Sequence, residues 1–110
     1  MAKFVITKRA NEELQFSLKA GNGQEILASE GYSAKAGCLN GIESVRKNSQ
    51  IAERFEEKVS KNGKFYFNLK SSNGQIVGTS EMYESKTAQE NGIASVMKNA
   101  PEATIDDQTL

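Results

Sequence analysis

Apolar and polar side chains alternate in several short stretches of the chain. The apolar positions of these stretches are Phe4, Ile6, Leu14, Phe16, Leu18, Phe65, Phe67 and Leu69. A period of two residues predicts strands with one buried face, because successive side chains of a strand point to opposite sides. We therefore expect strands over residues 4–8, 14–19 and 65–70.

Two Asn-Gly pairs, Asn22-Gly23 and Asn73-Gly74, follow the second and the later strand. Asn and Gly both tolerate positive φ, so these pairs indicate tight hairpin turns. A further strand is expected after each turn, over residues 25–28 and 76–79.

The apolar spacing changes to three and four residues after Tyr32 and Tyr83. This spacing is typical of one helix in each half of the chain. Ser33 and Ser85 are candidate N-caps. The helices are expected to end near residues 48 and 99, and short extended segments are expected over residues 51–59 and 103–106.

The two halves of the chain are copies of one unit. Residues 16–50 and 67–101 align without a gap at an offset of 51, and seventeen of the thirty-five positions are identical. This similarity indicates an internal duplication. A residue retained in both copies is required by the unit, whereas a residue present in one copy is not.

A length of 110 residues is typical of one domain. Each copy would form a small sheet with one helix, which buries too little surface to be stable alone. We therefore predict a single domain over residues 1–110, with repeats at about 1–51 and 52–107 that share one core.

The repeated pattern resembles the YegP-like family of small bacterial proteins, which has no assigned function. The pattern is an Asn-Gly hairpin, then S-E-x-Y-x-x-K, then N-G-I-x-S-V-x-K-N, and both copies carry it. The resemblance implies an α+β fold of two tandem β-β-β-α-β repeats. These would form one mostly antiparallel sheet, exchange their last strands and pack both helices on one face. The family brings no catalytic or binding residues.

Composition excludes several classes of partner and cofactor. Fourteen basic and fourteen acidic side chains leave no net charge to favour nucleic acid or an anionic membrane. With one Cys and no His, no metal or cofactor is expected; Glu56-Glu57 and Asp106-Asp107 should be solvated charges. No apolar run suggests a signal peptide or a membrane span, so we expect a cytoplasmic protein. We also expect a monomer, because the two repeats can satisfy each other within one chain.

The S-E-x-Y-x-x-K motif supplies the candidate site residues, which are Glu30, Tyr32, Lys35, Glu81, Tyr83 and Lys86. A Lys that lowers a tyrosine pKa could make an acid/base pair, but the glycine-rich loop of the dehydrogenases that use this pair is missing. Each Lys falls in the first turn of a helix, where the helix dipole disfavours a cation. Its partner should be the preceding Glu, or else an anionic ligand.

Asn40-Gly41 and Asn91-Gly92 fall in the middle of the helices. A glycine there costs about 1 kcal/mol relative to alanine. Close packing of the helix against the sheet, or of the two helices against each other, would explain both glycines. A backbone opened for a ligand is the alternative.

The sheet face opposite the helices is expected to carry Gln15, Ser17, Lys19, Tyr66, Asn68 and Lys70. This face is either solvated or covered by a partner, but it has too few aromatic side chains for a typical nucleic-acid surface. No catalytic constellation is present. The leading hypothesis is therefore a non-catalytic interaction or binding module of unknown partner. The alternatives are a small-molecule-binding protein or enzyme that uses the Tyr/Lys junctions, and nucleic-acid binding on the open sheet face.

Overall fold

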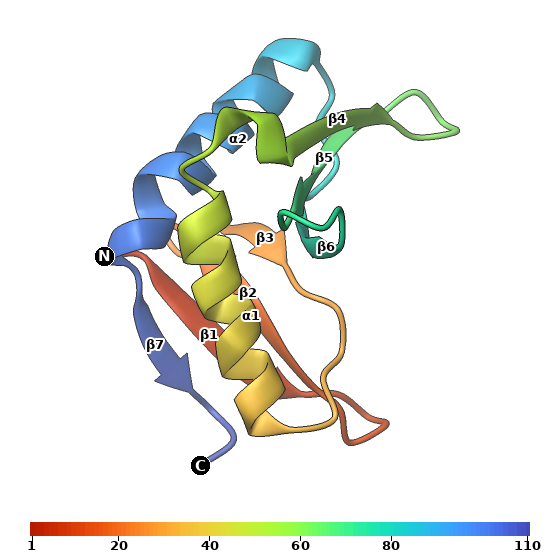
Figure 1. Cartoon of the computed structure of the whole chain (residues 1–110). Helices are drawn as coiled ribbons and strands as arrows, with labels where there is room; N and C mark the ends of the chain where they lie inside the picture. The colour runs from red at the N-terminus through yellow and green to blue at the C-terminus, as the bar shows by residue number, and fades with distance from the viewer.

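The computed structural model describes all residues from 1 to 110. Each repeat contributes three strands and one helix, and a seventh strand closes the chain (Figure 1). The first repeat contains β1 (Lys3–Lys8), β2 (Leu14–Lys19), β3 (Glu25–Ala28) and α1 (Lys35–Asn48). The second contains β4 (Phe55–Val59), β5 (Phe65–Lys70), β6 (Ile76–Thr79), α2 (Lys86–Asn99) and β7 (Thr104–Asp107). Short 3-10 turns follow the helices, η1 (Ala52–Arg54) and η2 (Ala100–Glu102).

All seven strands form one sheet in the order β4-β5-β6-β3-β2-β1-β7. Only β1 and β7 pair in parallel, and every other pair is antiparallel. Both helices lie on the same side of the sheet (Figure 1). The predicted α+β fold of two tandem repeats is therefore confirmed.

The two repeats meet through β3 and β6, where Ala28 pairs with Thr79. These two residues are equivalent in the repeats, so the pseudo-twofold axis passes between them. Leu27 and Gly78 are also equivalent, and a Cβ on Gly78 would lie 2.6 Å from Cδ2 of Leu27. Equivalent side chains that meet at the axis compete for one space, which explains why one is large and the other has no side chain.

The segment after each helix crosses to the other repeat. After α1 the chain forms β4, which pairs with β5, and after α2 it forms β7, which pairs with β1. Because β4 is both the exit from the first repeat and the first strand of the second, the sheet has seven strands. As a result β1 has a neighbour on each side, whereas β4 is an edge strand.

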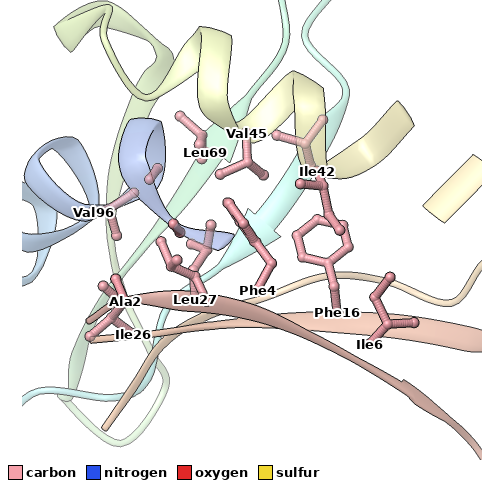
Figure 2. Close-up of a cluster of buried hydrophobic side chains, with 14 of the residues drawn as sticks. Ala2, Phe4, Ile6, Phe16, Ile26, Leu27, Ile42, Val45, Leu69 and Val96 are labelled. Carbon is pink, nitrogen blue, oxygen red and sulfur yellow. The ribbon is translucent and has the colours of Figure 1, made fainter. Parts of the chain in front are cut away.

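One cluster of 17 buried apolar residues takes side chains from both repeats (Figure 2). Phe4 packs edge-on against Phe16, with ring centroids 5.8 Å apart, and Phe16 stacks on Tyr32 at 6.1 Å. Phe55, Phe67 and Tyr83 repeat this arrangement at 5.7 and 6.3 Å. Aromatic side chains dominate the apolar area of such small cores, so these two trios anchor the fold.

The helix boundaries agree with the sequence at three of the four ends. Both helices end at the expected Asn48 and Asn99. Ser85 caps α2 by accepting a hydrogen bond from the Ala88 amide at 3.0 Å. The prediction for Ser33 was wrong, because Ala34 holds the equivalent position in α1 and makes no side-chain cap.

Candidate binding clefts

The serines of the repeated motif close the junction between the third strand of each repeat and its helix. The hydroxyl of Ser29 accepts a hydrogen bond from the Phe16 amide at 2.9 Å and donates one to the Glu30 carbonyl at 2.8 Å. Ser80 makes the equivalent pair of bonds at the same distances, to Phe67 and Glu81. These serines satisfy buried backbone groups, so their retention in both copies has a structural cause.

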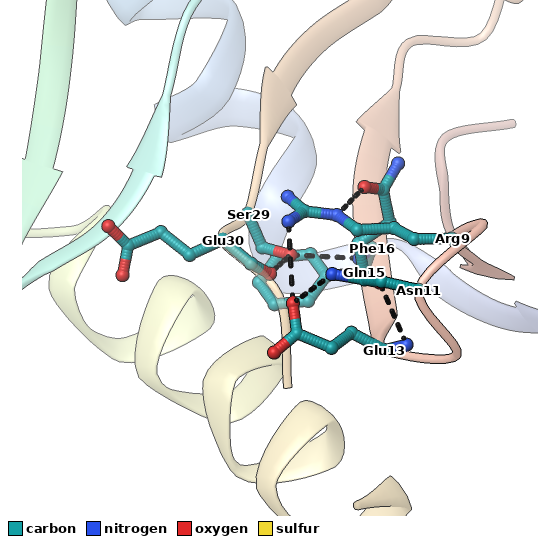
Figure 3. A network of polar contacts seen from close by, with 7 residues as sticks. All are labelled: Arg9, Asn11, Glu13, Gln15, Phe16, Ser29 and Glu30. Carbon is teal, nitrogen blue, oxygen red and sulfur yellow. Dashed lines mark hydrogen bonds and ion pairs between the residues drawn. The ribbon is translucent and has the colours of Figure 1, made fainter. Parts of the chain in front are cut away.

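The junction of the first repeat carries a polar network of its own (Figure 3). Arg9 donates to Gln15 at 2.5 Å and lies 3.7 Å from the carboxylate of Glu13. A Cβ on Gly31 would overlap that carboxylate. The second repeat has Met82 at the position of Gly31, with 55% of its surface exposed. Gly31 therefore leaves the space that the side chains of Glu13 and Arg9 occupy.

The motif tyrosines explain the glycines in the middle of the helices. A Cβ on Gly41 would overlap the hydroxyl of Tyr32, and one on Gly92 would overlap the hydroxyl of Tyr83. Each tyrosine ring also stacks on a core phenylalanine. The glycines are thus required by packing. The nearest neighbour is the tyrosine of the same repeat, and at Gly41 the ring of Phe16 in β2 would also lie 3.0 Å from the added Cβ.

The environment of both tyrosines keeps the phenols protonated. Burial raises the pKa of Tyr32 above 10.0, and the nearby Cys38 and Glu30 raise it further. Burial also raises the pKa of Tyr83, with a smaller contribution from Glu81. An acid/base role would require the opposite shift.

The motif lysines pair with carboxylates from the strands that cross between the repeats. Lys35 forms an ion pair with Asp107 of β7, and Lys86 forms one with Glu57 of β4. The expected pairing with Glu30 and Glu81 was wrong. The strand exchange brings a carboxylate beside each helix start, which the local sequence does not reveal.

The ion pair of Lys35 has a clear effect on its partner. The Lys35 hydrogen bond, helped by two hydrogen bonds from Thr109, lowers the pKa of Asp107 from 3.8 to about 2. In the second repeat the Glu57 hydrogen bond raises the pKa of Lys86. Neither Asp107 nor Glu57 is a free solvated charge, which corrects the expectation for the two acidic pairs.

The structure separates the six candidate residues. Glu30 and Tyr32 line one cleft, and Tyr83 lines another. Lys35 lines neither, and Lys86 lies in a separate hollow with Glu57. Glu81 lies beside Glu25 of the first repeat; burial, more than Glu25, raises the pKa of Glu81.

The two clefts are related by the repeat. The first cleft has a volume of about 360 Å³ and is lined by Tyr32, Asn40 and Ser44 of the first repeat together with Gln75 and Val77 of the second. The second cleft, of about 230 Å³, is lined by the equivalent residues Tyr83, Asn91, Ser95, Gln24 and Ile26. Each cleft therefore lies between the helix of one repeat and the third strand of the other.

Sequence reasoning noted Asn40 and Asn91 only for the glycines that follow them, and it missed Gln24 and Gln75. All four amide side chains are exposed, and none makes a hydrogen bond within the chain: Asn40, Asn91, Gln24 and Gln75. Only the backbone groups of the two glutamines take part in the hairpin turns. All four belong to the identical positions of the repeat. The signal that could have identified them was their retention in both copies at surface positions.

No three His, Cys, Asp or Glu side chains are grouped so that they could hold a metal ion. Cys38 is fully buried, and burial raises the pKa of its thiol. Neither helix has the length and apolar character needed to cross a bilayer.

The fold and its two clefts define a tandem-repeat α+β protein, and comparison with known proteins identifies the family. The model of a domain of unknown function, DUF1508, matches residues 10–56 and 60–107. A UPF0339 protein of Shewanella oneidensis is 53% identical over 106 residues, which cover 96% of each chain. The UPF0339 protein YegP of Escherichia coli K12 is 49% identical, with the same coverage.

A solved structure agrees with this relationship. The solution NMR structure of the protein of unknown function yegP from E. coli superposes with a TM-score of 0.93 at 48% identity, and the match covers 97% of this chain and 92% of that one. The chain belongs to the DUF1508 (UPF0339) family, and the resemblance to YegP is confirmed. The names of these relatives indicate no specific function.

Proposed function

We propose that the protein is a non-catalytic binding module that binds a small polar ligand in its two repeat-related clefts. The observation that carries this proposal is the position of retained polar side chains that have no partner within the chain. The amides of Asn40 and Gln75 share the first cleft, and those of Asn91 and Gln24 share the second.

Several other retained polar residues have structural partners, so retention alone does not mark a site. Ser44 and Ser95 bind the side chains of Asn48 and Asn99 at 3.1 Å, which completes the helix ends. The motif serines and lysines are also satisfied internally. The cleft amides are identical in both repeats although they have no hydrogen-bond partner within the chain. Binding of a ligand would explain why they are retained.

The chemistry of the clefts favours binding over catalysis. Amide and hydroxyl groups donate and accept hydrogen bonds without changing protonation at neutral pH. The tyrosine phenols are held protonated, and Lys35 and Lys86 are engaged by carboxylates outside the clefts. A small polar ligand with neighbouring donors and acceptors matches this lining.

The alternative of nucleic-acid binding has less support from the open sheet face. Lys70 lies 3.1 Å from Glu56, which neutralises one of the cations that such a surface would use. Ser17 and Asn68 in the centre of that face are buried. The assignments to the cytoplasm and to a monomer stay predictions, which cell fractionation and sedimentation would check.

NMR of the ¹⁵N-labelled protein tests the proposed function, because each Asn and Gln side chain gives its own pair of amide signals. We expect a library of neutral sugars, polyols and amino-acid amides to contain compounds that shift the signals of Asn40 and Gln75, or of Asn91 and Gln24. Asn40→Ala and Asn91→Ala should abolish the shifts in their own clefts. Thr87→Ala, an exposed change on α2 outside both clefts, is the matched control.

Shifts that persist in both Asn variants would contradict the proposal. So would a cell extract that shifts only the face of Gln15 to Lys19 and Tyr66 to Lys70, because the partner would then lie on the sheet. Failure of every compound and of the extract to move a cleft amide would also remove the proposed function.

A further inference from the structure

The first cleft continues into a second hollow between α1, η1 and the turn from β5 to β6. This hollow has a volume of about 370 Å³, and it shares Asn40, Ser44 and Ser71 with the first cleft. Its other lining residues are Glu43, Lys47, Asn48, Arg54 and Ser72, so no apolar side chain borders it. We refer to these five residues as the basic extension.

The two cations of the basic extension are not neutralised by an ion pair. Lys47 is exposed and forms no salt bridge. Arg54 donates through Nη1 to Oδ1 of Asn48 at 2.5 Å, a neutral acceptor that orients the guanidinium and leaves its other donors available. The carboxylate of Glu43 already pairs with Arg46.

Hydroxyl groups lie beside these cations. Ser72 makes no side-chain hydrogen bond within the chain, and Ser71 lies at the boundary with the first cleft. A guanidinium, an ammonium and a hydroxyl together offer many donors to an anion with several oxygens. This set suits a phosphate better than a neutral group.

The positive charge is local, since the whole chain has no net charge. It is also confined to one half of the molecule. At the offset of 51, Arg54 corresponds to Ile105, and Ser71 and Ser72 correspond to Ala20 and Gly21. Of the two cations only Lys47 has a basic equivalent, Lys98. The equivalent region of the second repeat therefore lacks the guanidinium of Arg54 and the hydroxyls of Ser71 and Ser72.

We propose that the first cleft binds a phosphorylated small molecule, with its phosphate at Arg54, Lys47 and Ser72 and its polar body against Asn40 and Gln75. This inference rests on the proposed binding function of the first cleft and gives its ligand a chemical class. The second cleft, which has no counterpart of Arg54, is left to neutral ligands.

Titration with inorganic phosphate, glucose 6-phosphate and glucose, followed by ¹⁵N NMR, tests the inference. We expect both phosphates to shift the backbone amide signals of Arg54 and Ser72. Of these two compounds, only glucose 6-phosphate should also shift the side-chain amide signals of Asn40 and Gln75. Lys47→Gln and Arg54→Gln should each weaken binding of glucose 6-phosphate by roughly tenfold or more, because each removes a charge-assisted hydrogen bond. Lys98→Gln, the change at the equivalent position of the other repeat, should leave the affinity unchanged.

Lys47 is exposed, so Lys47→Gln keeps the test independent of any loss of stability in Arg54→Gln. Equal weakening by Lys98→Gln would overturn the inference, because binding would then follow overall charge. If glucose 6-phosphate left Arg54 unmoved while a neutral ligand still shifted Asn40 and Gln75, the phosphate site would be wrong and the proposed function would stand. If phosphate moved Arg54 but no ligand moved either amide, the proposed function would fail and the phosphorylated ligand would fail with it.

Discussion

Tyr32 and Gly41 form a matched pair of residues that the repeat preserves as Tyr83 and Gly92. The ring lies against the helix at the one position that has no side chain. A glycine inside a helix costs about 1 kcal/mol relative to alanine. Packing of a large aromatic ring offsets this cost, so the pair is retained together.

Gly41→Ala should destabilise the protein by about 1–3 kcal/mol, because the new methyl group overlaps the Tyr32 hydroxyl and overpacks the core. Gly37→Ala on the same helix is the matched control. A Cβ there would lie 3.4 Å from Tyr32, and the second repeat has Ala88 at this position. The control should therefore be neutral or slightly stabilising. Urea unfolding of the three proteins measures both effects, and equal stability of all three would show that the tyrosine does not require the glycine.

Cys38 and Gln89 show how equivalent buried positions can differ in chemistry. Both side chains are almost fully buried. Gln89 donates to the carbonyls of Lys58 at 3.2 Å and Tyr66 at 2.7 Å, so its amide is satisfied beside the edge strand β4. Cys38 behaves as a small apolar residue, in agreement with its place on the apolar stripe of the helix.

The exchanged strands are the elements that the motif lysines connect to the helices. Lys35 joins α1 to β7, and Lys86 joins α2 to β4. These ion pairs are at the surface, where such pairs contribute modestly to stability. The two ion pairs connect the start of each helix to the strand that follows the other helix, β7 for α1 and β4 for α2.

The titration of Asp107 tests the contact between α1 and β7. Its pKa is about 2 in the folded protein and ordinary, near 3.8, in the unfolded chain. A lowered folded pKa means that the stabilisation is present above pH 3.8 and is lost as the pH falls through about 2. We expect Lys35→Met to destabilise the protein at neutral pH and to raise the pKa of Asp107 toward 3.8.

The carboxyl ¹³C shift of Asp107, followed from pH 6 to pH 1.5, measures this pKa. Lys86→Met, the equivalent change in the second repeat, should leave the Asp107 midpoint where it is. A midpoint that is unchanged in Lys35→Met would mean that the Thr109 hydrogen bonds alone hold the carboxylate ionised.

In the whole molecule the two repeats cover each other and share one apolar core. Leu27 of the first repeat fills the space opposite Gly78 of the second, and β7 covers the outer side of β1. A fragment of the first repeat alone would expose the free edge of β3 and an incomplete core. Chains of about 50 residues with such losses are marginal.

A chain ending at Gln50 should therefore be unfolded or self-associated. Circular dichroism and sedimentation at micromolar concentration distinguish these states from a folded monomer. Addition of a fragment of residues 51–110 should restore the helical signal as a complex of the two halves. A folded monomeric first half would disprove the prediction of one shared domain over residues 1–110.

Most elements of the fold were predictable because their signals are local. The alternation around Phe16 and Phe67 predicted strands, Asn22-Gly23 and Asn73-Gly74 predicted the turns, and both turn glycines have positive φ. The repeat itself located the residues that each unit requires. The resemblance to the YegP-like family supplied the strand exchange, which no local pattern contains.

The candidate site was only partly predictable. Glu30, Tyr32 and Tyr83 do line clefts, but the glutamine of each cleft, Gln75 or Gln24, comes from the opposite repeat. Gln75 reaches the first cleft only because β6 packs beside α1. The spacing of residues along the sequence does not show which residues of the two repeats become neighbours across the pseudo-twofold axis.

The sequence by itself determined the duplication, the strand and helix types, the turns and the apolar core, because hydrophobic periodicity and turn chemistry act over a few residues. Only the tertiary structure decided the partners of Lys35 and Lys86, the pairing of each tyrosine with a glycine, and the position of Arg54 in the hollow beside the first cleft. These depend on which segments the crossovers bring together. Long-range contacts of this kind arise from the packing of the whole chain, so they become visible only when both repeats are folded against each other.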